Sequence, residues 1–442
     1  MKILIVSWYF PPVNTIGALR VGKFARFLIE RGHDIGVVAG RYWGQPETLP
    51  LGVPLARVAY AKSVDVNAPP QRVQRMLSQW RGSGDAQPAP APATAPEATP
   101  PRRSLLNQLS DVYLNATNLP DNRIGWLPWA NSAATSLSRD WRPDLIFGSG
   151  PPFTAFLACH RLSRRLGTPW IAELRDRWAD DPYDTPPAWR GRLNQWLERR
   201  ILGSAAGLVT VTEPWAEAYR RKYALPVATI YNGYDPLDFD FPDPPPIDRE
   251  HLVIGYTGGI YPGRRDPTPL FAALHRLGPL DERFRVVFCG TDPGHVLPLA
   301  DAAGVSRLVE VRPGVPYRQS LEFQRACDIL LLMQWNDPRE QGNCPGKFFE
   351  YLASLRPVLV LGLEDGVPAT IVRERQAGFC ANDPAQIAAQ LEAWLAEKDR
   401  LGRVAALPAA ARDGLSRTIQ FEALEKFLLA RSAEAGRRGR EL

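Results

Sequence analysis

The chain has 442 residues, 45% of them hydrophobic, which exceeds a typical single domain and favours two domains with conventional cores. Its net charge of +6 and sequence pI of about 9.1 suit phosphate-bearing ligands, an anionic membrane face or simple solubility, and do not single out nucleic acid. Five scattered cysteines without a CxxC pair or a His/Cys cluster indicate neither a disulfide framework nor a zinc site, and fit a reducing cytoplasm.

The first residues, MKILIVSWYFPP, predict a buried strand over Lys2–Ser7 rather than an export signal, because the apolar run is short, aromatic and ended by two prolines. Helical spacing then predicts a helix over Gly17–Arg31, and a second strand follows over Ile35–Ala39. No segment approaches the roughly 20 apolar residues needed to cross a bilayer. We therefore expect a soluble or peripheral protein that begins with a βαβ unit.

The same alternation continues along the chain. Strands are predicted over 144–147, 169–172, 207–211 and 227–231, which gives a mostly parallel sheet with helices on both faces. The Pro- and Asp-rich stretch 232–250 predicts a linker, after which strands are predicted over 252–258, 284–290, 308–312, 328–333 and 357–362. The prediction is an α/β chain with domains at 1–235 and 236–442. Whether the amphipathic stretch 417–429 packs back across the junction stays open.

One segment interrupts this pattern. Residues from about 82 to 103, with GDAQPAPAPATAPEATPP at 84–101, contain almost no bulky side chains and predict a disordered surface insertion. The preceding stretch 71–81 predicts a helix with apolar residues and Trp80 on one face and arginines elsewhere. It is interpreted as an ordinary surface helix or as a membrane-surface contact.

The loops after the strands of the first domain are the first place to look for a site, because open α/β sheets bind ligands there. Gly17 lets the backbone approach a ligand, and Arg20 places a cation near a positive helix end; the alternative is a loop glycine with a solvent-facing arginine. The absence of GxGxxG weakens a nicotinamide-cofactor interpretation. After the predicted strand 169–172, charged residues including Arg175 and Asp176 indicate a polar cleft wall rather than a metal pair.

In the second domain, a glycine-rich turn with Gly258 and Gly259 is followed by Arg264 and Arg265 and a helix start, which predicts a diphosphate cradle.

A second phosphate signal lies in PGKFFEYLASLRPVLVLG. Pro345 suits the first helical position, so Gly346 and Lys347 lie in the first turn, where a cation is disfavoured by roughly 0.3–1 kcal/mol unless an anion compensates. A phosphate would meet the helix end and the Lys347 ammonium, while Glu350 would accept both hydroxyls of a ribose. The alternative is a Lys347–Glu350 surface pair.

Taken together, PP…GALR, ELRDRW, YNGYD and PGKFFEYLASLRPVLV resemble family 4 glycosyltransferases of GT-B fold, in the branch that serves bacterial surface polysaccharides. The resemblance covers nearly the whole chain except the Pro/Ala insertion. It implies two Rossmann-like, doubly wound domains facing a central cleft, and transfer of a sugar from a nucleotide diphosphate with retention of configuration.

The resemblance also implies roles for individual residues. Gly17 matches the acceptor-side loop, Arg264 or Arg265 and Lys347 match the groups that hold the donor diphosphate, and Glu350 matches the glutamate that holds the ribose. The first glutamate of the family's pair is replaced by Gly342, with Glu340 nearby, and Arg175 and Asp176 stand where the family often has a histidine.

The function expected from the sequence is a retaining glycosyltransferase that uses a UDP-, GDP- or dTDP-sugar and a saccharide or polyprenyl-linked acceptor. Arg264, Arg265, Lys347 and helix amides would stabilise the leaving diphosphate without an obligatory metal or other cofactor. Arg175, Asp176 and Glu350 are the catalytic candidates, with Asp176 orienting the acceptor. Peripheral binding to the anionic inner face of the cytoplasmic membrane is expected, and no nucleic-acid partner.

Two alternatives remain for the activity. One is a sugar-nucleotide epimerase or hydrolase on the same two-domain plan. The other is a non-catalytic nucleotide-sugar-binding component of a polysaccharide assembly complex, which the glycine at position 342 makes conceivable.

Overall fold

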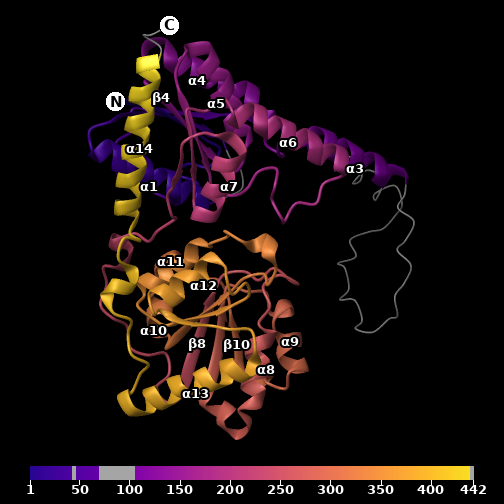
Figure 1. Cartoon of the computed structure of the whole chain (residues 1–442), viewed down its shortest axis with the longest axis vertical. Coiled ribbons are helices and arrows are strands. Elements are labelled where there is room, and N and C mark those ends of the chain that lie inside the picture. The colour runs from indigo at the N-terminus through magenta and orange to yellow at the C-terminus, as the bar shows by residue number, and fades with distance from the viewer. Residues whose placement is uncertain (42–45, 69–104, 439–442) are drawn as a thin grey trace. The chain divides into compact units, whose positions relative to one another are not determined.

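The computed structural model describes residues 1–41, 46–68 and 105–438, and the chain divides into two compact units (Figure 1). Unit 1 comprises Met1–Val209, Tyr219–Ala228 and Phe427–Leu442, and unit 2 comprises Thr210–Ala218 and Thr229–Lys426. The predicted insertion at 82–103 and the predicted helix at 71–81 lie outside the described residues. Among the helices that the structure describes, none is both long and apolar enough to cross a membrane.

The first sheet has seven strands in the order β3-β2-β1-β4-β5-β6-β7. Its strands are β1 (Lys2–Ser7), β2 (Asp34–Gly40), β3 (Arg57–Ala61), β4 (Leu145–Gly150), β5 (Trp170–Leu174), β6 (Gly207–Thr210) and β7 (Val227–Thr229). The opening residues form an interior strand, since Ile3 pairs in parallel with Ile35 of β2 on one side and with Leu145 of β4 on the other. A strand covered on both faces is a continuous apolar run, which explains why MKILIVS has the appearance of a signal segment.

The helices of the first half connect these strands. They are α1 (Ile16–Glu30), α3 (Leu105–Thr117), α4 (Leu127–Asp140), α5 (Thr154–Leu166), α6 (Ala188–Leu202) and α7 (Glu213–Tyr223), with a 3₁₀ turn, η1, at Ile124–Trp126. Helix α1 lies within one residue of its predicted bounds. The Thr15 side chain caps it by accepting from the Ala18 amide, and Val21, Phe24 and Leu28 are buried as their spacing predicts.

The second sheet has six strands in the order β10-β9-β8-β11-β12-β13, and it confirms that the α/β alternation restarts after the linker. Its strands are β8 (Leu252–Thr257), β9 (Phe284–Cys289), β10 (Val309–Arg312), β11 (Ile329–Met333), β12 (Val358–Leu361) and β13 (Gly378–Cys380). The helices are α8 (Thr268–Arg276), α9 (Leu297–Ala302), α10 (Tyr317–Ala326), α11 (Gly346–Ala353), α12 (Val367–Glu374), α13 (Pro384–Leu401) and α14 (Arg417–Arg438). Single 3₁₀ turns are η2 (Pro236–Phe239), η3 (Gly278–Arg283), η4 (Pro293–His295), η5 (Ser306–Leu308), η6 (Pro338–Glu340) and η7 (Ala409–Arg412).

Helices cover both faces of this second sheet. Alternate residues of β8 point to opposite sides: Leu252 and Ile254 join a core with α8, α9 and α13, whereas Val253 joins a core with α10, α11 and α12. Both cores are built from buried apolar side chains, so both faces of the sheet are covered. The carboxyl ends of its parallel strands therefore carry the loops at fixed positions.

The predicted linker is irregular but held in place. Apart from η2, residues 232–250 form no helix, and Asp235 caps that turn by accepting from the Leu237 amide at 3.0 Å. The backbone of Tyr234 donates to Leu415 and accepts from Arg417 at 2.7 Å, at the start of α14. Helix α14 extends beyond the predicted stretch 417–429; Arg417–Lys426 group with unit 2 and the rest with unit 1.

Candidate functional site

Three glycine-containing loops meet at the carboxyl edge of the second sheet. Gly258, directly after β8, has a φ of +96° and donates to the carbonyl of Cys289, while its own carbonyl accepts from the Thr291 hydroxyl at 2.7 Å. A Cβ built on Gly290 would lie 3.5 Å from the Gly314 Cα and 3.8 Å from the Gly258 Cα. This close approach of backbone leaves a surface without side chains beside the candidate diphosphate loop.

Lys347 belongs to this glycine surface. Its Nζ donates to the Thr257 carbonyl at 2.6 Å, lies 3.8 Å from the ring centroid of Tyr256, and would be 3.5 Å from a Cβ on Gly258. Burial lowers the pKa of Lys347 well below its usual value, and Arg265 lowers it further against the opposing pull of Glu350. The structure thus holds a desolvated cation beside Gly258, near a second cation.

Helix α11 begins one residue later than predicted. Pro345 is its N-cap, with φ −68° and ψ 144°, and not its first helical residue. Gly346 is that first residue, and a Cβ there would have no neighbour within 4 Å. Lys347 is consequently the second residue of the helix, where amide groups are still unpaired and the axis end is positive.

Glu350 does not pair with Lys347. No ion pair joins the two in the described part of the chain, so the predicted surface-pair alternative is wrong. Glu350 instead accepts from the Tyr317 hydroxyl at 3.1 Å and from Gln324 Nε2 at 3.3 Å, both from α10. Burial raises the pKa of Glu350, which Arg417 and these hydrogen bonds oppose. The Tyr317 hydroxyl also lies 3.2 Å from a carboxylate oxygen of Asp238.

The two arginines of the glycine loop differ in their surroundings. Arg265 Nη1 donates to the Gly259 carbonyl at 3.3 Å, and its guanidinium lies 4.4 Å from the ring centroid of Tyr261. Arg264 stacks on Trp335, 4.7 Å from the ring centroid. Because Arg265 is the one that lowers the pKa of Lys347, it is the arginine that shares the electrostatic field of that lysine. Sequence reasoning did not select Trp335, since nothing in the sequence between Arg264 and Trp335 signals that the two side chains meet.

Gly342 has a structural reason to be glycine. Its φ is +88°, and a Cβ would lie 2.3 Å from Cδ1 of Trp215, so neither backbone nor space accommodates a glutamate. Its carbonyl accepts from the Thr212 hydroxyl at 2.6 Å. Glu340 is buried and accepts from Asn343 Nδ2 at 2.7 Å. Position 342 can therefore contact a ligand only through its backbone, not through a side chain.

In unit 1, Arg20 is buried rather than solvent-facing. Its side chain is 4% exposed, and Nε and Nη2 donate to Glu173 Oε1 at 3.0 and 2.9 Å. Glu173 is 2% exposed and its other oxygen accepts from Ser149 at 2.6 Å. The alternative of a solvent-facing arginine is wrong, because a buried carboxylate at the end of β5 requires this cation.

Gly17 and Arg175, from the loops after β1 and β5, are neighbours. A Cβ on Gly17 would lie 2.9 Å from Arg175 Nη1 and 3.1 Å from Tyr9 Cδ2, so glycine makes room for the guanidinium. Arg175 Nη2 donates to the Pro151 carbonyl at 2.6 Å, while its buried Nε has no hydrogen-bond partner among the described residues. Burial lowers the pKa of Arg175.

Asp176 follows on the same loop and reaches solvent. Although this residue reaches solvent, the protein around its carboxylate displaces part of the water and raises its pKa; Arg175 opposes the rise and Asp181 adds to it. The loop therefore presents a carboxylate next to a strongly held guanidinium.

The described residues contain no group of three or more His, Cys, Asp or Glu side chains that could hold a metal ion. All five cysteines lie in the described part and none forms a disulfide.

Residues 17–233 match the family model of the glycosyl transferase 4-like domain. Among solved structures, HepE of Anabaena in complex with UDP and glucose has 14% sequence identity and a TM-score of 0.59, and covers 97% of this chain and 100% of its own. Sucrose-phosphate synthase of Thermosynechococcus elongatus has 14% identity and a TM-score of 0.58, with 100% and 98% covered. The lipopolysaccharide outer core galactosyltransferase WaaB has 10% identity and a TM-score of 0.56, with 97% and 99% covered. No curated protein sequence matches.

Two sheets of parallel strands with loops at their carboxyl ends are shared with these structures along nearly the whole chain, and this is the GT-B fold. The match to the glycosyl transferase 4-like domain identifies the enzyme class as glycosyltransferase. That match spans residues 17–233, which is just under half of the chain.

Proposed function

We propose that this glycosyltransferase transfers a sugar from a nucleotide-diphosphate sugar to a saccharide or lipid-linked acceptor, with retention of configuration, in the synthesis of a surface polysaccharide. The observation that carries the proposal is Lys347, a cation kept at the positive end of α11 beside the glycine surface of Gly258. Such a cation has an energetic reason to be there if an anion binds. The complexes of HepE with UDP and with UDP-glucose support a nucleotide sugar.

The donor diphosphate is assigned to Gly258, Gly259 and Gly346 for backbone approach and to Lys347 and Arg265 for charge. Arg264, stacked on Trp335, supplies a further cation on the same loop. During transfer the bond between the anomeric carbon and the diphosphate oxygen breaks, and the electron pair leaves with the nucleoside diphosphate. Cations already in place stabilise that developing charge without reorganising, so no obligatory metal is proposed.

Glu350 is assigned to the ribose of the donor. Its carboxylate is fixed by Tyr317 and Gln324, which use one lone pair on each oxygen and leave others to accept hydroxyl groups.

On the acceptor side, the proposal assigns Gly17, Arg175 and Asp176, with Arg20 holding this region in place through Glu173. A leaving phosphate oxygen takes the acceptor proton as the new glycosidic bond forms on the same face of the sugar. Asp176 orients the acceptor hydroxyl in this scheme. For a lipid-linked acceptor, the proposed location is the cytoplasm at the inner membrane face.

A thermal-shift screen with UDP, GDP and dTDP tests the donor assignment, with Lys347→Met as the comparison. We expect one nucleotide diphosphate to raise the unfolding temperature of the natural protein and to do so much less in the variant. No stabilisation by any of the three contradicts the proposal.

The alternatives separate in a second measurement, the release of nucleoside diphosphate with and without acceptor. Equal release without acceptor indicates a hydrolase. Binding of the nucleotide sugar without transfer to any lipid-linked acceptor indicates a non-catalytic component. The absence of a side chain at Gly342, where the family has a glutamate, is the observation that favours this alternative.

A further inference from the structure

Helix α6 exposes a stripe of large apolar side chains. Trp189, Leu193 and Trp196 are 48%, 38% and 56% exposed, and their spacing of four and three residues places them on one face of the helix. We call these three residues the tryptophan stripe. Single exposed apolar residues are ordinary, but two tryptophans aligned on one helix face form a patch that needs a partner.

Arginine side chains lie next to the tryptophan stripe, on the same helix and on α5. Arg200 is the next residue on the same face, one turn after Trp196, and its guanidinium lies 5.8 Å from the Trp196 ring. Arg161, Arg164 and Arg165 lie on α5. Together with Arg200 they form what we call the arginine cluster. All four are exposed, and within the described ranges none forms an ion pair with a carboxylate. The one acidic residue of α6, Glu198, is buried and accepts from Lys222 and the Ala179 amide.

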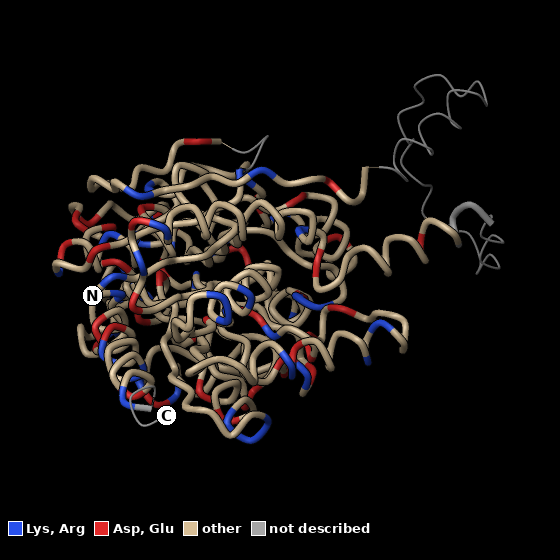
Figure 2. The backbone as a smooth tube through the Cα atoms, turned by 90° about the horizontal axis from the view of Figure 1, so that it is seen from above, with Lys and Arg blue, Asp and Glu red and all other residues tan. Residues whose placement is uncertain are grey.

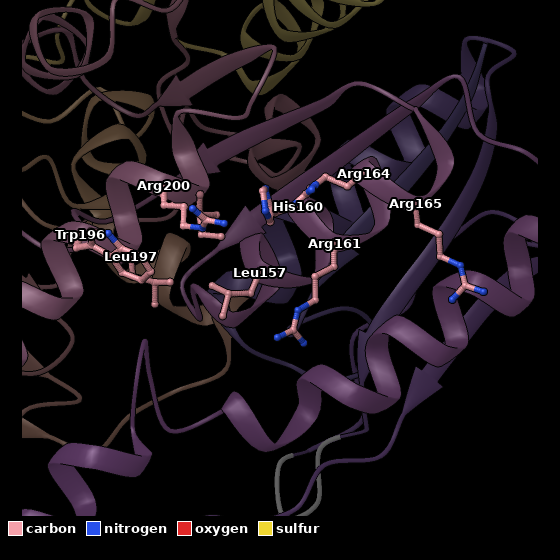
Figure 3. Close-up of a pocket in the computed structure, with 9 residues that line it drawn as sticks. Leu157, His160, Arg161, Arg164, Arg165, Trp196, Leu197 and Arg200 are labelled. Atoms are coloured by element: carbon pink, nitrogen blue, oxygen red, sulfur yellow. The ribbon is translucent and has the colours of Figure 1, made fainter.

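The two helices border a groove of about 580 Å³. The arginine cluster, His160 and Trp196 line it, and Figure 3 shows Arg164 and Arg200 on either side of His160 in that view. The pKa of His160 is lowered, first by burial and then by repulsion from Arg164, Arg200 and Arg161. The groove is thus a region of positive potential with an aromatic wall.

Local helix energetics explain only part of this arrangement. Arg164, Arg165 and Arg200 lie in the last turns of their helices, where a cation complements the helix dipole. The dipole gives no reason for Arg161, one turn earlier, or for exposed tryptophans. Elsewhere along the backbone basic and acidic positions are interspersed, as Figure 2 shows.

We propose that the tryptophan stripe and the arginine cluster together dock this protein on the surface of an anionic bilayer. The arginines contact headgroup phosphates, and the groove takes one of them between α5 and α6. The tryptophans and Leu193 insert at the boundary of headgroups and acyl chains, where amphipathic rings are favoured. A soluble anion would engage the arginines but give the tryptophan stripe no apolar partner, which is why the observations favour a membrane.

The inference rests on the proposed function in one respect, because a lipid-linked acceptor makes docking useful. It is nevertheless tested separately, since vesicle binding needs neither donor nor acceptor. The arginine cluster lies toward the C-terminal ends of α5 and α6, away from the loops after the strands of the first sheet. Release of nucleoside diphosphate in detergent solution is therefore expected to be unchanged in the arginine-cluster variant below.

The experiment is cosedimentation of the full chain with vesicles of phosphatidylcholine alone or with phosphatidylglycerol added. We expect binding only to the anionic vesicles, weakened by high salt. Arg161→Gln/Arg164→Gln/Arg165→Gln is expected to lower the partition coefficient on the order of 10²-fold, since each arginine near an anionic surface contributes about fivefold. Trp189→Gln/Trp196→Gln is expected to lower it by roughly tenfold.

Matched controls lie on unit 2. Arg276→Gln/Arg373→Gln/Arg400→Gln removes three exposed arginines and the same charge, and Leu297→Gln/Leu401→Gln removes two exposed apolar side chains. Both are expected to retain most of the binding.

Equal losses in the arginine-cluster variant and its control overturn the proposal, as does equal binding to neutral vesicles. Full competition by inorganic diphosphate at low concentration overturns it in favour of a soluble anion site. A change of oligomeric state in the tryptophan variant overturns it in favour of a second copy as partner.

Discussion

Lys347 Nζ lies 2.6 Å from the carbonyl oxygen of Thr257, so that the second residue of α11 is bonded to the last residue of β8. One N–H of the ammonium is satisfied by this carbonyl, and the Tyr256 ring covers another side of the charge at 3.8 Å. These two contacts compensate in part for burial and for the positive end of α11. They leave the ammonium poorly solvated, so that its charged form gains from contact with a bound diphosphate.

Lys347→Met is expected to leave the free energy of unfolding of the empty protein within about 1 kcal/mol, because a lost hydrogen bond and a relieved desolvation cost nearly cancel. Turnover is expected to fall on the order of 10²–10³-fold, since a preorganised charge opposite the leaving group is removed. Chemical denaturation and donor turnover check the two parts.

Lys426→Met, an exposed lysine of α14, is the control and is expected to change neither quantity. Unchanged turnover in Lys347→Met would show that this lysine does not meet a phosphate.

The lowered pKa of Lys347 gives a prediction about pH. A bound diphosphate favours the charged ammonium, so binding raises this pKa and takes up a proton. Affinity for the nucleoside diphosphate is therefore expected to fall as the pH rises through the lowered pKa of the empty protein. Stability of the empty protein changes in the opposite direction: between the lowered pKa and about 10.4 the unfolded chain binds more protons, so the free energy of unfolding rises with pH.

Calorimetric titration in buffers of different ionisation enthalpy measures the proton uptake directly. The same pH dependence of affinity in Lys347→Met would rule out this lysine as its source.

Much of the fold follows from apolar periodicity, because buried parallel strands such as β1, β8 and β11 are continuous apolar runs bounded by turns. The strands β3 and β13 were not predicted. Both lie at sheet edges, where β3 alternates partly buried and exposed residues and β13 has only three residues, so neither leaves a strong pattern.

The candidate site could be predicted as one unit where a single motif carries several residues, as with Gly346, Lys347 and Glu350, whose assignment to the donor stays a prediction. It was not predictable where partners come from distant segments, as with Tyr317 and Glu350 or Arg264 and Trp335. A charged residue near a helix start also does not reveal its partner: Arg20 and Lys347 gave the same signal, but Arg20 faces a buried glutamate and Lys347 a glycine surface.

Gly342→Ala is expected to destabilise unit 2 by about 2–4 kcal/mol. An alanine at φ +88° is strained, and its Cβ would overlap the Trp215 ring unless that side chain moves. Gly278→Ala is the matched control, because Gly278 also has a positive φ, +57°, but no atom lies within 4 Å of its Cβ position.

The control is expected to cost about 1 kcal/mol, so the difference between the two variants measures the packing against Trp215 alone. Denaturation midpoints supply both numbers. Equal costs would mean that Trp215 moves freely and that position 342 could hold a side chain.

The last prediction concerns the buried pair of Arg20 and Glu173. Measurements of unfolding free energy and of turnover distinguish a structural role of this pair from a role in acceptor binding. Replacing Glu173 by Leu leaves the Arg20 guanidinium without its carboxylate at a position that is 4% exposed, and is expected to cost about 3–5 kcal/mol. The double variant Arg20→Met/Glu173→Leu removes both charges and is expected to be more stable than Glu173→Leu alone, since the unpaired charge is gone. Ser149 loses its acceptor in both variants, so its contribution cancels in this comparison. Unfolding free energies of the two single variants and the double variant complete the cycle. If the double variant is instead as unstable as the sum of the single ones, the pair does not couple; a normal stability with lost turnover in Arg20→Met would then assign that arginine to the acceptor.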